Sequence, residues 1–197
     1  MSEKTMRAFY HITITGRLCY IFMCIERYLI TLYPDRDWTI VAEKMWQWTA
    51  HSPWDESCDI YSEVVPEYIF EFDGYEETNR CEYEGKLKRE DYEETTSLFR
   101  GITNSDDKDE ICQVLVIPCR FSHFAECSSL PSIEKYTAEL IDKLESILQK
   151  HGIQLPDKSA LQPFTFKREE PMKSMESMAT VWGNLVNTEC LSIILNP

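Results

Sequence analysis

Three side chains in the middle of the chain have the types and the spacing that a zinc site requires. Cys119, His123 and Cys127 recur at every fourth position, and Cys112 lies seven residues before Cys119. In one continuous helix these thiol and imidazole groups would share a face and could ligate zinc. Structural zinc sites usually take ligands from two elements, however, and Pro118 interrupts this run. We therefore expect buried thiols and no metal ion, while the spacing keeps a metal at these residues open as the alternative.

The remaining nucleophiles, acids and bases do not form a catalytic pattern. The chain has no GxSxG motif, no P-loop and no glycine-rich dinucleotide turn. Its four histidines, at positions 11, 51, 123 and 151, have no neighbour in the sequence that suggests acid or base catalysis. We therefore expect no enzymatic activity, no catalytic residue and no cofactor. A hydrolase whose pocket gathers distant carboxylates and histidines is the less favoured interpretation.

Carboxylates are abundant, and most of the net negative charge lies in one stretch. The chain carries a net charge of −14, and residues 55–94 hold fifteen Asp or Glu against four Lys or Arg. Such a surface repels phosphate backbones and attracts basic proteins, which argues against nucleic-acid binding. Its simplest interpretation is a solvated acidic face that keeps the protein soluble. Glycoside hydrolysis is not indicated, because it needs two carboxylates at a set separation, one of them in a dry environment.

The tryptophans gather immediately before this acidic stretch, since residues 37–54 hold four of the five. An apolar stripe at helical spacing predicts a helix here, with Trp48 on the flank of the stripe and Ile40 pointing away. The stripe consists of Trp38, Val41, Ala42, Met45, Trp46 and Thr49. Tryptophans can also form a sugar-binding platform, but the helical spacing favours core packing.

Further helices are predicted on both sides of this stripe. Residues 6–33 predict one long helix or two consecutive helices, closed by Pro34. Ser52 as N-cap and Pro53 as first helical residue start a third helix, which ends before Pro66. Its inward stripe is Trp54, Cys58, Tyr61 and Val65, and its outer face carries Asp55, Glu56, Asp59 and Glu63.

Beyond Pro66 the periodicity is less decisive. Residues 67–79 fit a short helix or extended chain, and residues 90–100 predict an acidic helix that stops at Gly101. Residues 110–127 suit a central helix kinked at Pro118, with a buried strand as the alternative.

The clearest helical pattern runs over residues 133–151 and ends at Gly152. Residues 153–175 contain three prolines and are expected to be irregular, with PFTFKR as a short strand, while residues 181–197 pack back onto the core. These elements predict a mainly α fold: one helical domain over residues 1–197, a multi-helix bundle with at most a short strand or hairpin. No pattern fixes an oligomeric state.

Neither a membrane anchor nor a secretory signal is indicated. The most apolar segment, LCYIFMCI at residues 18–25, is far shorter than the roughly 20 residues that span a bilayer. Charged residues interrupt the first 17 positions, and no small-residue cleavage site follows them. We therefore expect a cytoplasmic protein.

The chain resembles the helical immunity proteins of bacterial polymorphic toxin systems. The resemblance rests on Trp38 and Trp46, the WDxxxDIYxExxPE run from Trp54 to Glu67, Trp182-Gly183 and the closing Leu191-Ser192-Ile193-Ile194. It covers residues 37–73 and about 181–196, which is less than a third of the chain. It implies an antidote that binds and blocks a cognate toxin domain, with no catalysis and no cofactor.

Many such toxins are basic nucleases, so the resemblance and the charge together imply that acidic side chains contact the partner. The expected partner-binding residues are Asp55, Glu56, Asp59, Glu63, Glu67, Glu71 and Asp73. An acidic helical adaptor or regulatory protein that binds a basic partner is the alternative, because it would share the same surface properties.

Overall fold

The computed structural model describes residues 3–50, 54–78, 87–103, 108–127, 129–167, 181–183 and 187–197, and most of them are helical. In chain order the helices are α1 (Glu3–Ala8), α2 (Ile14–Leu32), α3 (Thr39–Gln47), α4 (Trp54–Ser62), α5 (Pro66–Ile69), α6 (Tyr75–Thr78), α7 (Arg89–Phe99), α8 (Glu110–Leu115), α9 (Ile117–Cys127) and α10 (Leu130–Lys150). The described residues also form three short 3-10 helices: η1 (Trp48–Ala50) between α3 and α4, and η2 (Lys158–Phe164) and η3 (Glu189–Leu191) after α10. The predicted mainly α fold is confirmed.

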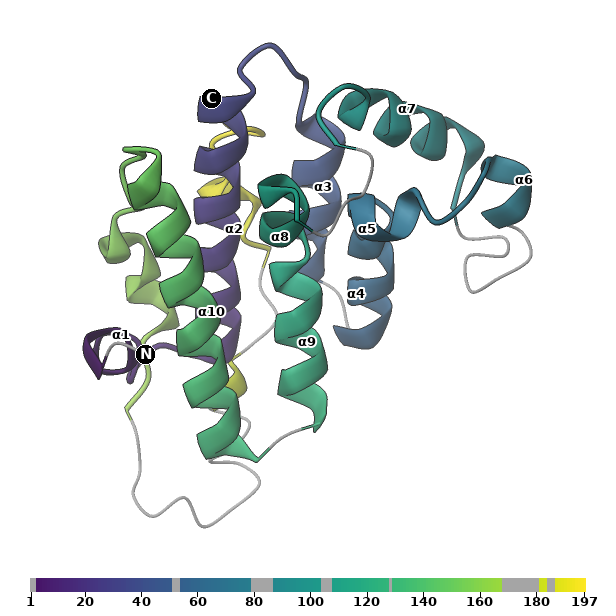
Figure 1. Ribbon diagram of the computed structural model, residues 1–197. Coiled ribbons are helices and arrows are strands. Elements are labelled where there is room, and N and C mark those ends of the chain that lie inside the picture. Colours follow the sequence, from purple (N-terminus) through teal and green to yellow (C-terminus); the bar gives the residue numbers. More distant parts are fainter. Residues whose placement is uncertain are drawn as a thin grey trace.

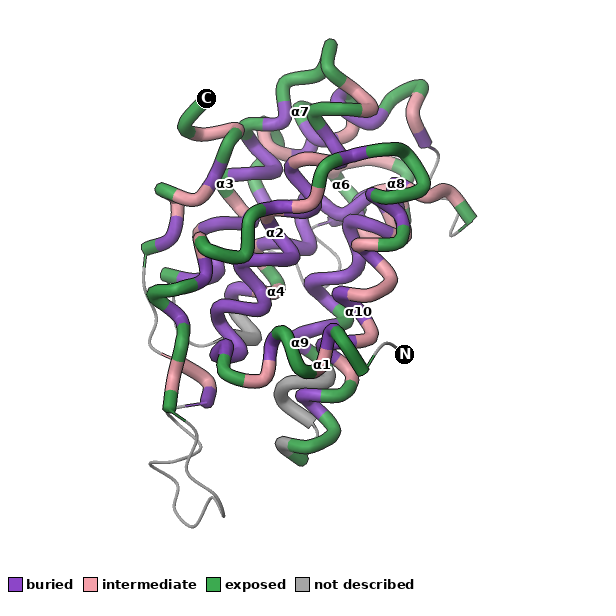
Figure 2. The backbone as a smooth tube through the Cα atoms, turned by 90° about the vertical axis from the view of Figure 1, so that its left-hand side faces the viewer, coloured by how far each residue is buried: buried purple, intermediate pink, exposed green. Residues whose placement is uncertain are grey.

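α2 is the central helix of the fold. The hydroxyl of Thr13 caps it by accepting a hydrogen bond from the Gly16 amide at 3.1 Å, and the helix ends at Leu32, before Pro34. Fourteen of its 19 residues are buried. α3, α9, α10 and η2 all pack against it. Figure 1 shows its place among these helices, and Figure 2 shows that most of it is buried. Residues 6–33 therefore form two consecutive helices, as one of the two predictions had it.

A buried arginine ties the start of α2 to α10. Arg17 is 2% exposed, and its guanidinium group donates to the carbonyl oxygens of Phe9 at 2.8 Å and Glu134 at 3.2 Å. It also donates to the hydroxyl of Thr137 at 2.8 Å. A buried guanidinium group is costly unless its donors are satisfied, so these contacts fix α1, α2 and α10 relative to one another.

Aromatic rings fill the space between α2, α3 and α4. The ring centroids of Phe22 and Trp46 lie 5.3 Å apart in an edge-to-face arrangement, and those of Trp48 and Tyr61 lie 5.6 Å apart. All six residues of the predicted stripe are buried: Trp38, Val41, Ala42, Met45, Trp46 and Thr49. Core packing is therefore confirmed for the tryptophans at 38, 46 and 48.

The opposite face of α3 is only partly open to solvent. Ile40 is only 8% exposed, because α4 and α7 pack against α3 from this side. The expectation that Ile40 points away is therefore wrong. The predicted cap at Ser52 and Pro53 lies outside the described residues, as does the side chain of Trp54.

Short helices follow Pro66, so the extended alternative for residues 67–79 is wrong as far as Thr78. α5 and α6 lead to α7, and Gly101, at φ 79°, follows the end of α7 as predicted. Beneath these helices lies a second apolar cluster, which consists of Ile69, Leu87 and Tyr92.

Residues 110–127 are helical, which rules out the buried strand. The helix breaks at Val116: α8 ends one residue before it and α9 begins one residue after it. Pro118 lies in the first turn of α9, where its missing N–H costs no helical hydrogen bond. α10 confirms the clearest sequence pattern, and Gly152 follows it at φ 67°.

Residues 153–167 are irregular apart from η2, as predicted. In the described part of the chain, one antiparallel bridge is formed, between Ile12 and Thr165, so residues 163–167 of the predicted strand form a bridge rather than a strand. None of the described helices has the length and apolar character that crossing a bilayer requires.

The last described segment, residues 187–197, packs back onto α2 and α3 as predicted. Its main anchor is Glu26, a carboxylate in α2 with no solvent exposure. Glu26 accepts hydrogen bonds from Trp46 Nε1 at 2.7 Å, from Ser192 Oγ at 2.5 Å and from the Ile193 amide at 2.8 Å. Burial raises the pKa of Glu26, and these three donors partly oppose the rise.

Candidate functional site: an acidic groove between α3, α4 and α7

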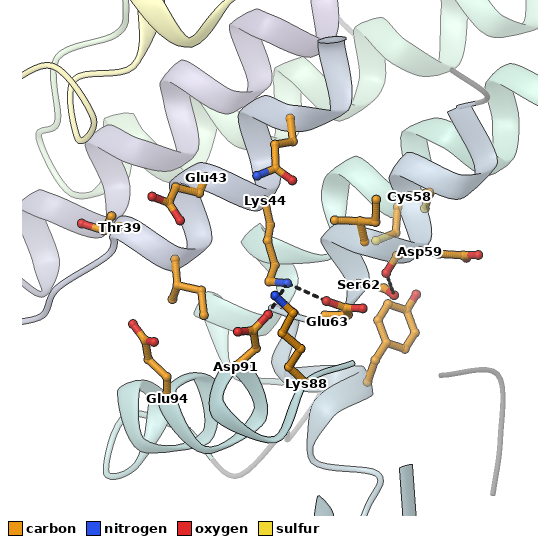
Figure 3. A pocket seen from close by; sticks show the side chains of 15 residues that line it. Thr39, Glu43, Lys44, Cys58, Asp59, Ser62, Glu63, Lys88, Asp91 and Glu94 are labelled. Carbon is orange, nitrogen blue, oxygen red and sulfur yellow. Dashed lines mark hydrogen bonds and ion pairs between the residues drawn. The ribbon is translucent and has the colours of Figure 1, made fainter. Parts of the chain in front are cut away.

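A groove of about 810 Å³ lies where α3, α4 and α7 meet. Figure 3 shows it from close by. Five carboxylates and two lysines line it: Glu43, Asp59, Glu63, Asp91 and Glu94, with Lys44 and Lys88. We call this the acidic groove. Helical periodicity explains how it forms, because its residues on α3 and α7 recur three or four positions apart and so share one face of each helix.

Lys44 occupies the inner part of the acidic groove. Its Nζ donates to Glu63 Oε2 at 2.6 Å and to Asp91 Oδ2 at 2.9 Å, and its side chain is only 12% exposed. Burial alone would lower the pKa of Lys44, but the hydrogen bonds from its ammonium group to the two carboxylates outweigh burial and raise that pKa. The three side chains therefore join α3, α7 and the end of α4 as a charged cluster.

The end of α4 explains why Glu63 turns inward. The hydroxyl of Ser62 donates to the carbonyl oxygen of Asp59 at 2.6 Å, and the helix stops there. Glu63 then lies in a turn and is 6% exposed. Its expected place on the outer face of the helix is therefore a wrong prediction, because it is buried against Lys44.

Other carboxylates stand at the mouth of the acidic groove. Glu43, Asp59 and Glu94 are exposed and come from three different helices. Within the described residues, Glu43 and Glu94 have neither an ion pair nor a side-chain hydrogen bond. Lys44 offsets only one of the two carboxylates that it binds, so the lining retains an excess of negative charge.

The remaining predicted partner-binding residues do not line the acidic groove. Glu71 and Asp73 are exposed on the connection from α5 to α6, and Glu67 is half-buried on α5. Asp55 and Glu56 lie in the first turn of α4, and their side chains are outside the described part of the structure. Of the seven predicted residues, Asp59 and Glu63 are brought together at the groove.

Sequence reasoning missed Glu43 and Lys44 as site residues and included Asp91 and Glu94 only within the general acidic stretch. Glu43 precedes that stretch and shares a helix with the tryptophans. The sequence feature that could have indicated both residues is the polar pair Glu43-Lys44, which lies opposite the apolar stripe of the predicted helix.

Two thiols lie in the wall of the same groove, Cys58 on α4 and Cys119 on α9. A hydrogen bond with Cys58, together with burial, raises the pKa of Cys119 well above its ordinary value. His123 is exposed, and the side chain of Cys127 lies outside the described residues. Within the described residues, no three side chains of His, Cys, Asp or Glu are grouped so that they could hold a metal ion.

The acidic groove and the aromatic core define a mainly helical protein with an acidic, concave surface between three helices. Comparison with protein-family models, with curated proteins and with solved structures gave no match.

Proposed function

We propose that this protein binds a basic protein partner through the acidic groove and the exposed carboxylates beside it. The observation that carries this proposal is the groove itself, where exposed carboxylates from three helices surround a concave surface and retain an excess of negative charge. A solvated acidic face requires no such cavity, whereas a concave surface lined by carboxylates is complementary in charge to a basic partner.

The partner that we propose is the toxin domain of a bacterial polymorphic toxin system, and the protein is its antidote. This step rests on the sequence resemblance to helical immunity proteins. Inhibition by occlusion needs no catalytic residue or cofactor. Opposite charges on the two proteins would steer their encounter and raise the association rate toward about 10⁸ to 10⁹ per molar per second, which suits an antidote.

The proposal is tested by isothermal titration calorimetry of the full chain against the product of any toxin-domain gene adjacent to its own, at low and high salt. We expect one-to-one binding that weakens as salt rises. The absence of binding would overturn the antidote function.

A matched pair of variants tests the surface. Charge reversal of Glu71→Lys with Asp73→Lys should weaken binding by about tenfold or more at low salt. The control, Glu3→Lys with Glu139→Lys, makes the same change in charge on α1 and α10, on the far side of the molecule in Figure 1. Equal weakening by both pairs would show that net charge alone acts, and would contradict a defined binding surface.

A further inference from the structure

The acidic groove has a shape and a charge distribution that a general acidic face lacks. Figure 3 shows Glu43 and Glu94 on one side of the groove and Asp59 on the other, with the cluster of Lys44, Glu63 and Asp91 between them. The two sides differ, because Asp59 lies beside Ser62 and the end of α4, whereas Glu43 and Glu94 extend from facing helices.

The groove already binds one cationic group of its own chain. The Lys44 ammonium group sits between two carboxylates at 2.6 and 2.9 Å, which shows that this cavity accommodates a cation between α3 and α7. Nearer the mouth, Glu43 and Glu94 come from the same two helices but have no cation between them. Ile40, which is 8% exposed and lies one turn before Glu43 on α3, adds apolar surface to the wall.

We infer that the acidic groove receives an arginine side chain of the basic partner, whose guanidinium group is held by Glu43 and Glu94 at the mouth. This inference rests on the proposed function and names the mode of binding. A planar guanidinium group presents donors in a fixed fork, which matches two carboxylates better than a single ammonium group does. The aliphatic stem of the arginine packs against Ile40, since long cationic side chains bury their stems along apolar surface.

The probe for this site is the peptide acetyl-Ala-Arg-Ala-amide, and the neutral control is the same peptide with citrulline. Binding to the full chain is followed by amide chemical shifts in nuclear magnetic resonance titrations. We expect saturable shifts on α3, α4 and α7 with the arginine peptide and none with the citrulline peptide.

Two isosteric variants decide whether the groove is the site. Glu43→Gln with Glu94→Gln should weaken peptide binding by roughly five- to tenfold, as expected for two exposed ion pairs. The control Asp35→Asn with Glu90→Gln removes the same charge from exposed carboxylates outside the groove and should change binding by less than about twofold. Equal weakening by both pairs, or shifts confined to α5 and α6, would overturn the inference.

Two further outcomes separate this inference from the proposed function. If the toxin domain binds wild type and the Glu43, Glu94 variant equally well, the groove mode fails while the antidote function stands. If the groove amides shift when the protein is concentrated without peptide, a second copy of the chain occupies the groove, and the inference also fails.

Discussion

The indole Nε1 of Trp46 donates a 2.7 Å hydrogen bond to the carboxylate of Glu26, and both side chains are completely buried. This contact places an ionisable group of α2 directly beneath the largest ring of α3. It makes Trp46 a polar partner as well as a packing residue, so changes at this position remove two kinds of interaction.

Replacement of Trp46 by alanine should lower the free energy of unfolding by about 3 to 5 kcal/mol, because it opens a cavity in the aromatic core. Trp46→Phe keeps most of the ring volume but leaves Glu26 without one donor, and should cost about 1 to 3 kcal/mol. Urea denaturation followed by circular dichroism measures both. The control is Ile30→Ala, at a position 39% exposed, which should change stability by less than about 1 kcal/mol. An unchanged stability in Trp46→Ala would contradict the core position of this ring.

The titration of Glu26 should appear in the pH dependence of stability. Since burial raises the pKa of Glu26 above its ordinary value of 4.5, the folded state holds the proton more tightly than the unfolded state. This contribution to the free energy of unfolding is fully present below the ordinary pKa and is lost as pH rises through the raised pKa.

The Glu26→Gln variant lacks this titration and therefore isolates it. From about pH 4 to pH 8, the free energy of unfolding of the wild type should fall relative to that of the variant. Urea denaturation of both proteins across this range measures the difference. A difference that stays constant with pH would show that Glu26 has the same pKa in the folded and unfolded states.

Loss of Lys44 should leave Glu63 buried without its cation. We expect Lys44→Met to lower the free energy of unfolding by about 1 to 3 kcal/mol. The double variant with Glu63→Gln should recover part of this loss, because it removes the uncompensated charge. Lys88→Met is the matched control, since Lys88 lines the same groove, is exposed and has no ion pair within the described residues. Equal losses of melting temperature in Lys88→Met and Lys44→Met, measured by thermal denaturation, would refute a structural role for the charged cluster.

Gly16 should not tolerate even a methyl group. A Cβ atom there would lie 2.5 Å from Phe164 Cβ and 2.8 Å from Ile12 Cγ2, so Gly16→Ala must displace η2 from α2. The expected cost is about 1 to 3 kcal/mol. Gly74→Ala is the control, because a Cβ at that position meets no atom within 4 Å. Differential scanning calorimetry should show a lower melting temperature for the first variant alone, and equal melting temperatures would contradict the close approach.

The elements with a strong local pattern were predictable from sequence. α10 and the buried stripe of α3 follow from apolar residues at helical spacing, and the glycines at 101 and 152 mark helix ends through their backbone conformation. The choice between helix and strand for residues 110–127 was not predictable, since a continuous apolar run suits either element when it is buried.

The acidic groove was only partly predictable because its contacts join residues far apart in sequence. Glu63 pairs with Lys44, which is 19 residues away, and Asp91 pairs with the same lysine, which is 47 residues away. No local sequence pattern indicates that these residues are in contact. The exposure of Ile40 was wrongly predicted for the same reason. The sequence of α3 shows the apolar stripe of that helix, but it does not show that α4 and α7 pack against the opposite face. The acidic stretch did indicate the region, through Asp59.

The burial of α2 has a consequence for folding during translation, because the ribosome synthesises the chain from its N-terminus. One side of this helix is covered by α10, and its carboxylate Glu26 is satisfied by Ser192 and Ile193, more than 160 residues later. The segment LCYIFMCI therefore leaves the ribosome long before its covering elements are synthesised. During translation we expect this apolar helix to stay exposed, and the native core to close only after Ser192 and Ile193 have emerged.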